Sequence, residues 1–241
     1  MNVLDDKSDQ NHNADPTPTK NEKSNRYEHI KGIIFDMDNT LLQSKIDFQA
    51  MKQETYSFLV EHHILPEGLP IQQYTTSTII EEAVATNRMS AELLQAMWEI
   101  PVRHEVAGMH GAVLEPGVTE LLEQLHGYYH LAVVTNNSEK AAHSALRDNG
   151  IIHYFDHVAG REQMQSLKPS PDGFLYILNC YPTTAADEWL SIGDSWIDGK
   201  ASERAGIEFI AYRADIEKMK NGEVFPRKYF SHIGELMKVL S

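Results

Sequence analysis

The segment Ile33-Ile34-Phe35-Asp36-Met37-Asp38-Asn39-Thr40-Leu41-Leu42 carries the strongest structural signal in this 241-residue chain. Residues 32–35 form a short, β-branched apolar run, which is typical of a strand buried on both faces of a parallel sheet. Asp36 and Asp38 follow where that strand would end. Because ligands bind beyond the carboxyl ends of strands in open α/β sheets, we expect both aspartates to lie in a functional site.

From Leu114 onward the chain alternates short apolar runs with helical patterns, as βαβ units do. Strands are expected at residues 131–135, 155–159, 189–192 and 208–212, and a closing helix at residues 231–240. The predicted fold is therefore α/β, a doubly wound parallel sheet with an inserted small α-helical domain.

The inserted part runs from about Ser44 to His110, where apolar residues recur at helical spacing and no convincing strand appears. Pro66, Gly68 and Pro70 separate a first helix from a second, and Ser90 can cap a third. We expect Pro101 to kink or end this third helix near Ile100. The predicted division is a core of residues 27–43 and 112–241 and a helical domain of residues 44–111.

Residues 1–26 are rich in Asp, Asn, Lys, Ser, Thr and Pro and predict a disordered N-terminal arm. The formal net charge of −14 argues against nucleic acid or an anionic membrane as a partner. One cysteine, Cys180, allows no internal disulfide, and we expect it to be a core residue on a helix. The amino terminus lacks a secretory signal pattern, so the expected location is the cytoplasm.

Four polar features each follow a predicted strand: Asp36 with Asp38, Thr135 with Asn136, Lys168, and Asp194 with Asp198. In a parallel sheet these strand ends lie together. Converging aspartates repel one another unless a cation separates them, and a set of oxygen ligands without Cys or His suits Mg²⁺. With a lysine and hydroxyl and amide donors added, the sequence predicts a pocket for a phosphoryl group.

These motifs resemble those of the haloacid dehalogenase-like hydrolase superfamily, in its branch with a helical cap after the first motif. Phosphoglycolate phosphatases and β-phosphoglucomutases belong to that branch. The resemblance covers roughly residues 30–241, and all four motifs occur in order: Asp36-Met37-Asp38-Asn39-Thr40-Leu41, Val134-Thr135-Asn136, Lys168-Pro169 and Gly193-Asp194-Ser195-Trp196-Ile197-Asp198.

The resemblance implies a role for each motif residue in an Mg²⁺-dependent phosphatase that acts on a small phosphorylated metabolite. Asp36 is the implied nucleophile, which forms an aspartyl-phosphate, and Asp38 the general acid and base. The resemblance also implies that Mg²⁺ binds to Asp36, the Asp38 backbone carbonyl and Asp194, and that Asp198 either ligates through water or orients Lys168. The resemblance further implies that Thr135, Asn136 and Lys168 bind the phosphoryl group. Lys168 would also neutralise the negative charge that develops on it.

Two other activities remain open on the sequence alone. A sugar phosphomutase of the β-phosphoglucomutase type would share all four motifs, and a non-catalytic module on the same fold would bind a phosphorylated ligand or a protein. Asn39 stands where the family often has Gly, which would alter the turn after Asp38. In the helical domain, Arg88, Arg103 and His104 are weak candidates to contact the leaving group, while Leu94, Met97 and Trp98 are expected to pack its own core.

Overall fold

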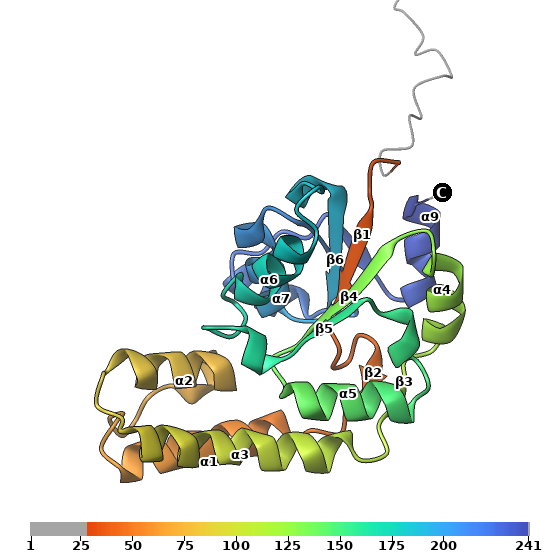
Figure 1. Cartoon of the computed structure of the whole chain (residues 1–241). Helices are drawn as coiled ribbons and strands as arrows, with labels where there is room; N and C mark the ends of the chain where they lie inside the picture. Colours follow the sequence, from red (N-terminus) through yellow and green to blue (C-terminus); the bar gives the residue numbers. More distant parts are fainter. Residues whose placement is uncertain (1–27, 241) are drawn as a thin grey trace, which may run out of the picture.

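The computed structural model describes residues 28–240, so the expected arm at residues 1–26 lies outside the described part of the chain. A sheet of six parallel strands forms the centre of the molecule (Figure 1). Across the sheet the strands follow the order β5 (His157–Ala159), β4 (His130–Val134), β1 (Gly32–Phe35), β6 (Trp189–Gly193), β7 (Glu208–Tyr212) and β8 (Lys228–Phe230).

Strand β1 lies between β4 and β6, with Phe35 in register with Val133 and Ile192. The chain leaves β1 toward β4 and β5, and then returns across the sheet to β6, β7 and β8. Connections therefore depart in opposite directions on the two sides of β1, which opens a crevice beyond the carboxyl ends of the central strands. The predicted doubly wound sheet is confirmed.

Alternate residues of β1 point to opposite faces of the sheet, as in any strand. Ile33 and Phe35 pack with α4 (Val118–Leu125), α5 (Glu139–Asp148) and α9 (Met237–Leu240). Ile34 packs instead with α6 (Asp172–Cys180) and α7 (Trp196–Ala205), while α8 (Ile216–Asn221) covers β7 on that side. Helices thus bury both faces, which explains the unbroken apolar strands.

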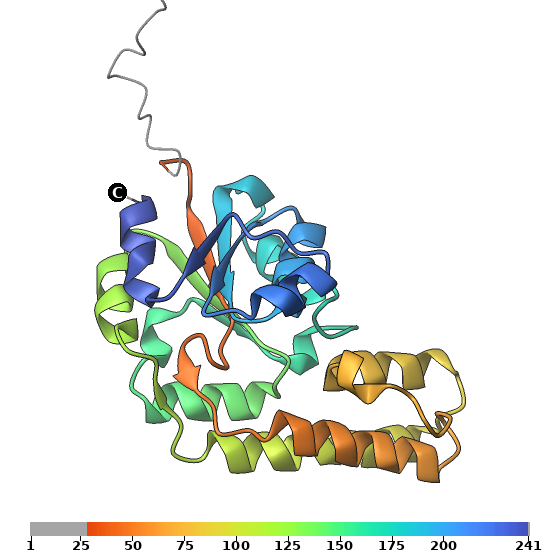
Figure 2. The ribbon, with the colours of Figure 1, turned by 180° about the vertical axis from the view of Figure 1, so that it is seen from behind.

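A separate group of three helices is inserted between β1 and β4, namely α1 (Phe48–Glu61), α2 (Thr76–Ala85) and α3 (Ala91–Met109). These helices, which we call the helical insertion, share their own apolar cluster around Leu59, Ile79 and Met97. The predicted Ser90 cap is confirmed, because its side chain accepts a hydrogen bond from the Leu93 amide. The insertion extends from one end of the core in both ribbon views (Figures 1 and 2).

Two short strands that the sequence did not predict join the insertion to the core. β2 (Leu42–Gln43) pairs antiparallel with β3 (Val113–Leu114), with Leu42 opposite Leu114. Where α3 ends, the chain passes so close to the start of the insertion that a Cβ on Gly108 would lie 2.5 Å from the Ile46 backbone. The two connections are therefore bonded and packed against each other.

Three details of the structure differ from the sequence-based predictions. Helix α3 continues through Pro101, because the lost amide removes one helical hydrogen bond while the helix stays packed against α1. Cys180 lies on a helix as expected, but it is the last residue of α6 and is exposed rather than part of the core. The closing helix begins only at Met237, after β8 and a 3₁₀ turn, η5. The 3₁₀ turns are η1 (Ile71–Gln73), η2 (Ile152–Tyr154), η3 (Arg161–Gln163), η4 (Ala186–Glu188) and η5 (Ile233–Leu236).

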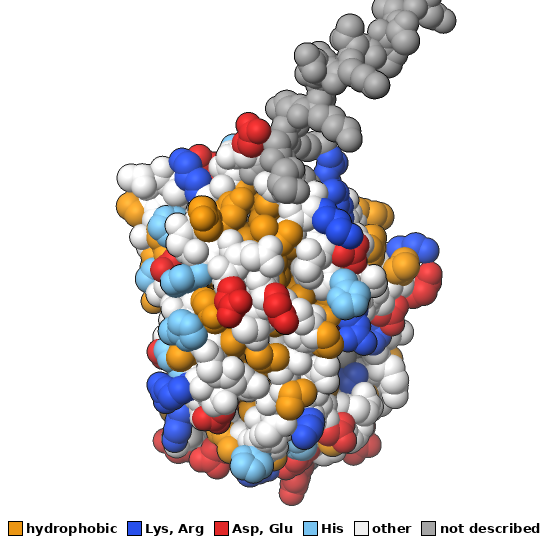
Figure 3. All heavy atoms as spheres, turned by 90° about the vertical axis from the view of Figure 1, so that its right-hand side faces the viewer, with side chains coloured by type: hydrophobic (Ala, Val, Ile, Leu, Met, Phe, Trp, Pro, Cys, Tyr) orange, Lys and Arg blue, Asp and Glu red, His pale blue; other side chains and the backbone are white. Residues whose placement is uncertain are grey.

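The surface and helices of the described part carry two further observations. On the face that Figure 3 shows, hydrophobic, acidic, basic and histidine side chains are interspersed rather than gathered by charge. Within residues 28–240 no helix combines the length and the apolar character that crossing a bilayer needs.

Candidate active site

The two aspartates after β1 stand at the crevice, and the backbone fixes the first of them. The Asp36 amide donates a hydrogen bond to the Ile192 carbonyl at 2.8 Å, which extends the sheet by one residue. Asp38 lies two residues further along the chain, where its Oδ2 accepts a hydrogen bond from Asn137 Nδ2 at 2.8 Å. Its other oxygen, Oδ1, is buried and has no hydrogen-bond partner within residues 28–240. An exchangeable proton or a ligand donor would satisfy this atom.

Asn39 adopts the turn conformation that a glycine would supply. Its φ of 58° lies in the left-handed region, and its amide donates to the Leu42 carbonyl at 2.7 Å. Asparagine tolerates this region better than other residues with a side chain. The departure from the common family pattern therefore leaves the turn after Asp38 intact.

Lys168 is the cation at the centre of the site, and its side chain is only 2% exposed. Its Nζ donates to Asp36 Oδ1 at 2.7 Å, to Asp198 Oδ1 at 2.6 Å and to the Val134 carbonyl at 2.9 Å. All three ammonium protons therefore have acceptors. This lysine fixes one oxygen of Asp36 and places a positive charge beside it.

The Thr135–Asn136 segment after β4 holds the loop that carries Lys168. Asn136 Nδ2 donates to the Lys168 carbonyl at 3.1 Å, and the Lys168 amide donates to Asn136 Oδ1 at 2.8 Å. The buried Thr135 hydroxyl accepts from the Asn137 amide at 3.2 Å. Asn136 thus links two loops that come from different strands and keeps Lys168 in position.

The acidic residues after β6 complete a cluster of carboxylates. Oxygens of Asp36, Asp194 and Asp198 all lie within 4.8 Å of one another. Both carboxylate oxygens of Asp198 accept hydrogen bonds: Oδ1 from Lys168 Nζ, and Oδ2 from the Ser195 amide at 3.0 Å. Gly193 permits this approach, since a Cβ there would lie 2.6 Å from Asp198 Oδ2.

Burial and mutual repulsion shift the pKa values in this cluster. Burial and the charge of Asp36 raise the pKa of Asp38 to about 7 and that of Asp198 to about 6. Burial and the neighbouring carboxylates also raise the pKa of Asp194 well above its usual value. Although burial opposes its charge, the carboxylates of Asp198 and Asp36 raise the pKa of Lys168.

One lysine thus faces four carboxylates in this site. The excess negative charge and the all-oxygen donor set suit a hard divalent cation, so the residues present fit Mg²⁺.

A cavity of about 1240 Å³ lies between the core and the helical insertion, with the carboxylate cluster on its wall. Glu105 of α3 reaches across to the core, where Arg161 Nη1 donates to its Oε1 at 2.7 Å and the Ser138 amide donates to its Oε2 at 3.2 Å. Arg161 also lies over the Trp98 ring at 4.8 Å. The insertion is therefore tied to the segment that follows Thr135–Asn136.

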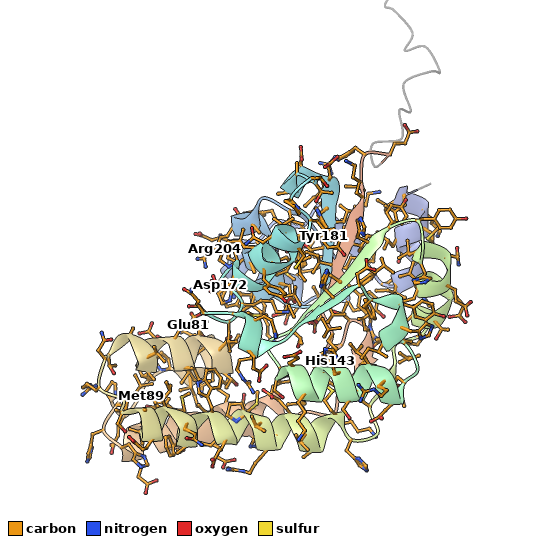
Figure 4. The ribbon with its side chains drawn as sticks, in the orientation of Figure 1. Glu81, Met89, His143, Asp172, Tyr181 and Arg204 are labelled. Atoms are coloured by element: carbon orange, nitrogen blue, oxygen red, sulfur yellow. The ribbon has the colours of Figure 1, made fainter. Side chains whose placement is uncertain are left out.

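A second approach between insertion and core occurs at Glu81 of α2. Figure 4 labels Glu81, Asp172 and Arg204 in the region where α2 comes closest to the start of α6. Burial raises the pKa of the Glu81 carboxyl, and the charges of Arg204 and Asp172 act on it in opposite directions. Charged groups of both parts thus interact here as well.

The structure brings all seven sequence-predicted site residues to the wall of this one cavity. The weaker candidates of the insertion lie elsewhere: Arg88 donates to the Ile64 carbonyl, and Arg103 and His104 pair with Glu54. Sequence reasoning missed Lys52, Glu105, Asn137 and Arg161, and it assigned Trp98 only to packing. Only Asn137 had a local signal, because it follows a recognised motif.

The comparisons with known proteins agree with this geometry. A family model described as "Haloacid dehalogenase-like hydrolase" matches residues 33–212, more than half of the chain. The chain therefore belongs to the haloacid dehalogenase-like hydrolases.

Two curated relatives are each named phosphoglycolate phosphatase. The one from Aliivibrio fischeri is 29% identical over 77% of this chain and 85% of its own length. The one from Vibrio cholerae is 30% identical over 73% of this chain and 81% of its own length.

Solved structures of the family share the fold. A structure described as a predicted phosphoglycolate phosphatase from Haemophilus somnus gives a TM-score of 0.61 at 22% identity, over 88% of this chain and 99% of that one. A second, described as a putative phosphoglycolate phosphatase from Lactobacillus plantarum, gives 0.63 at 20% identity, over 87% and 99%. At these identities the likeness concerns the fold.

Proposed function

We propose that this hydrolase cleaves small phosphate monoesters with Mg²⁺, through an aspartyl-phosphate on Asp36. The observation that carries the proposal is the buried contact of Lys168 with Asp36 and Asp198, beside an Asp38 carboxyl with a free oxygen. A held nucleophile, a fixed positive charge and a nearby proton donor are what two-step phosphoryl transfer needs. The phosphatases among its curated relatives support the same class.

In the first step a carboxylate oxygen of Asp36 bonds to phosphorus while the bond from phosphorus to the leaving oxygen breaks. Asp38 gives its proton to that leaving oxygen, which departs as an alcohol. In the second step the Asp38 carboxylate takes a proton from a water molecule, whose oxygen attacks phosphorus. Inorganic phosphate leaves and Asp36 is restored. A pKa of about 7 lets Asp38 act as acid and then as base near neutral pH.

The other site residues position and neutralise the phosphoryl group. Lys168 and the Thr135 hydroxyl face the developing negative charge, and the Asn136 segment contributes donors while it holds Lys168. Asp36, Asp194 and the Asp38 backbone carbonyl would hold Mg²⁺, and the bound ion would neutralise charge on the phosphoryl oxygens. Because both Asp198 oxygens already accept hydrogen bonds, we assign Asp198 to the orientation of Lys168.

We further propose that the helical insertion is a cap domain of residues 44–111 on a core of residues 27–43 and 112–241. The paired connections β2 and β3 are the place where such a cap would move. A closing cap would exclude water from the aspartyl-phosphate until Asp38 activates a single molecule. The substrate is then a metabolite small enough to be enclosed between cap and core.

A panel of phosphate monoesters tests this function. The purified protein is incubated with each ester, with and without Mg²⁺, and both free phosphate and isomerised sugar phosphates are measured. We expect phosphate release that requires Mg²⁺ and that falls by ~10³-fold or more in Asp36→Asn, since the nucleophile is lost. Isomerised sugar phosphate as the main product would instead indicate a phosphomutase. Ester turnover that survives in Asp36→Asn would contradict the mechanism, and binding without turnover would indicate a non-catalytic module.

A further inference from the structure

Lys52 is a cation on the cavity wall that the proposed chemistry does not use. Lys52 belongs to α1, on the side of the cavity opposite the carboxylate cluster's strands, and is only 9% exposed. Its Nζ donates to the Tyr74 carbonyl at 3.0 Å. A lysine this deeply buried is unusual unless its ammonium group has a charged partner.

The other cations on the cavity wall have such partners. Lys168 pairs with Asp36 and Asp198, and Arg161 pairs with Glu105. Lys218, which is mostly exposed, lies 3.8 Å from Asp215. Within residues 28–240 no carboxylate forms an ion pair with Lys52.

The surroundings of Lys52 disfavour its unpaired positive charge and favour a bound anion beside it. Burial and the positive charge of Lys218 both lower the pKa of the Lys52 ammonium. The start of α2 follows directly after Tyr74, and Thr76 and Ser77 line the same cavity. The first amides of a helix favour a negative group, and in α2 the Thr75 hydroxyl already accepts a hydrogen bond from one of them, the Thr78 amide. A positive charge and a helix N-terminus therefore face the same space.

We propose that Lys52 binds a second anionic group of the substrate, on the alcohol that leaves when phosphate is transferred. The preferred substrates are then small phosphate monoesters that also carry a carboxylate or a second phosphate, rather than neutral sugar or polyol phosphates. This inference rests on the proposed function, because the same cavity holds the reacting phosphate.

The proposal explains why the fold keeps a buried charge that costs stability. An ammonium group without a carboxylate partner loses hydration on burial, and a methionine of similar shape would avoid that loss. Lys52→Met should therefore keep or raise the thermal unfolding midpoint. A fall of several degrees would show that Lys52 serves the packing of the insertion, and the proposal would be wrong.

Kinetics with matched substrates test the selection. Phosphorylated glycolate carries a carboxylate, ethylene glycol bisphosphate a second phosphate, and 2-hydroxyethyl phosphate neither. The wild-type protein should prefer one or both charged esters, and Lys52→Met should reduce the ratio of charged to neutral kcat/KM by ~10–100-fold, chiefly through KM. The charged ester whose kcat/KM falls more in Lys52→Met identifies which anion Lys52 binds. Lys238→Met, at an exposed position of α9, removes the same charge away from the cavity and should leave the ratio unchanged.

A binding measurement separates this proposal from the proposed function. In an Asp36→Asn background, calorimetry measures the affinity of both charged esters with and without Lys52→Met. We expect a loss of ~10-fold or more for at least one of them. Equal affinities, or no binding of either ester, would overturn the role of Lys52. Failure of every ester to be hydrolysed would contradict the proposed function alone, since the calorimetric result still decides whether Lys52 binds the anion.

Discussion

Asp38 is the residue whose state of protonation matters most in this site. The structure gives it a buried oxygen without a partner, a neighbouring carboxylate in Asp36, and a pKa raised from 3.8 to about 7. Folding therefore favours the protonated carboxyl, which is the form that can donate to a leaving alcohol. The same property that suits catalysis should lower the stability of the ionised protein.

This coupling predicts how stability depends on pH. Because the folded pKa of Asp38 exceeds its unfolded value, its contribution to stability is complete below pH 3.8 and is lost as the pH rises through about 7. Asparagine cannot ionise, so Asp38→Asn should gain stability over the wild type across this window. Between about pH 4 and pH 8, we expect the free energy of unfolding of Asp38→Asn to rise by about 1–3 kcal/mol relative to that of the wild type.

Denaturant unfolding in EDTA at a series of pH values measures this difference. Glu61→Gln, on the exposed end of α1, provides a control that removes a carboxylate outside the cluster. A wild-type protein whose stability rises relative to Asp38→Asn between these pH values would contradict the assigned environment of Asp38.

At the scale of elements, the contact between Glu105 and Arg161 joins the helical insertion to the core. Glu105 is buried and the Arg161 side chain is 11% exposed, and the pair connects α3 to the segment between β5 and α6. Glu105 also accepts a hydrogen bond from the Ser138 amide at the start of α5. Removing one partner of a buried ion pair leaves the other charge without compensation and strongly destabilises the folded protein. This contact should therefore control how firmly the insertion is attached to the core.

Glu105→Gln should leave the Arg161 guanidinium buried without a counter-charge. We expect a loss of ~3–5 kcal/mol in the free energy of unfolding, measured by denaturant titration. The double variant Glu105→Met/Arg161→Met removes both charges and should recover a large part of that loss. Glu54→Gln breaks an exposed pair with Arg103 and should cost less than about 1 kcal/mol. Equal, small effects of Glu105→Gln and Glu54→Gln would contradict the role assigned to the buried pair.

The elements of the core were predictable because each has a local signature. Buried, mostly apolar runs marked β1, β4, β6 and β7, and capping residues such as Ser90 and Gly206 marked helix ends. The ribbon of β2 and β3 has only two residues on each strand, too few to show a period. The helix through Pro101 was missed because packing, which the sequence does not display, outweighed a local penalty.

The site was predictable only in its core half. Its aspartates, Thr135, Asn136 and Lys168 follow strands whose ends the sheet brings together, so chain order alone located them. Lys52, Glu105 and Arg161 reach the cavity through the placement of the helical insertion against the core. No spacing in the sequence distinguishes these three from solvated charges, so a three-dimensional structure was needed.

For the molecule as a whole, the proposed mechanism requires that the insertion moves as a cap. The cavity of about 1240 Å³ exceeds the volume of a small phosphate ester, so closure is needed to exclude water. Gln49 of α1 and Asn221 of α8 are exposed and line opposite parts of this cavity. A flexible bifunctional reagent joining cysteines at these two positions, in a Cys180→Ser background, should restrict the cap.

We expect this cross-link to reduce kcat by ~10-fold or more, because opening and closing accompany each turnover. Phosphate release is measured before and after the reagent is added, and each single-cysteine variant treated with the same reagent is the control. Full activity of the cross-linked protein would contradict cap movement, while the chemistry assigned to Asp36 and Asp38 would stand.

Trapping the phosphorylated form of Asp36 tests the proposed mechanism itself. Asp38→Asn is incubated with Mg²⁺ and radiolabelled p-nitrophenyl phosphate, whose leaving group needs no proton donor, and the reaction is stopped with acid. We expect label to accumulate to about one phosphate per protein, because the variant lacks the base for the second step. The label should lie on the peptide that contains Asp36 and be released by hydroxylamine. Label on another residue, or none while the wild type releases phosphate, would contradict the mechanism.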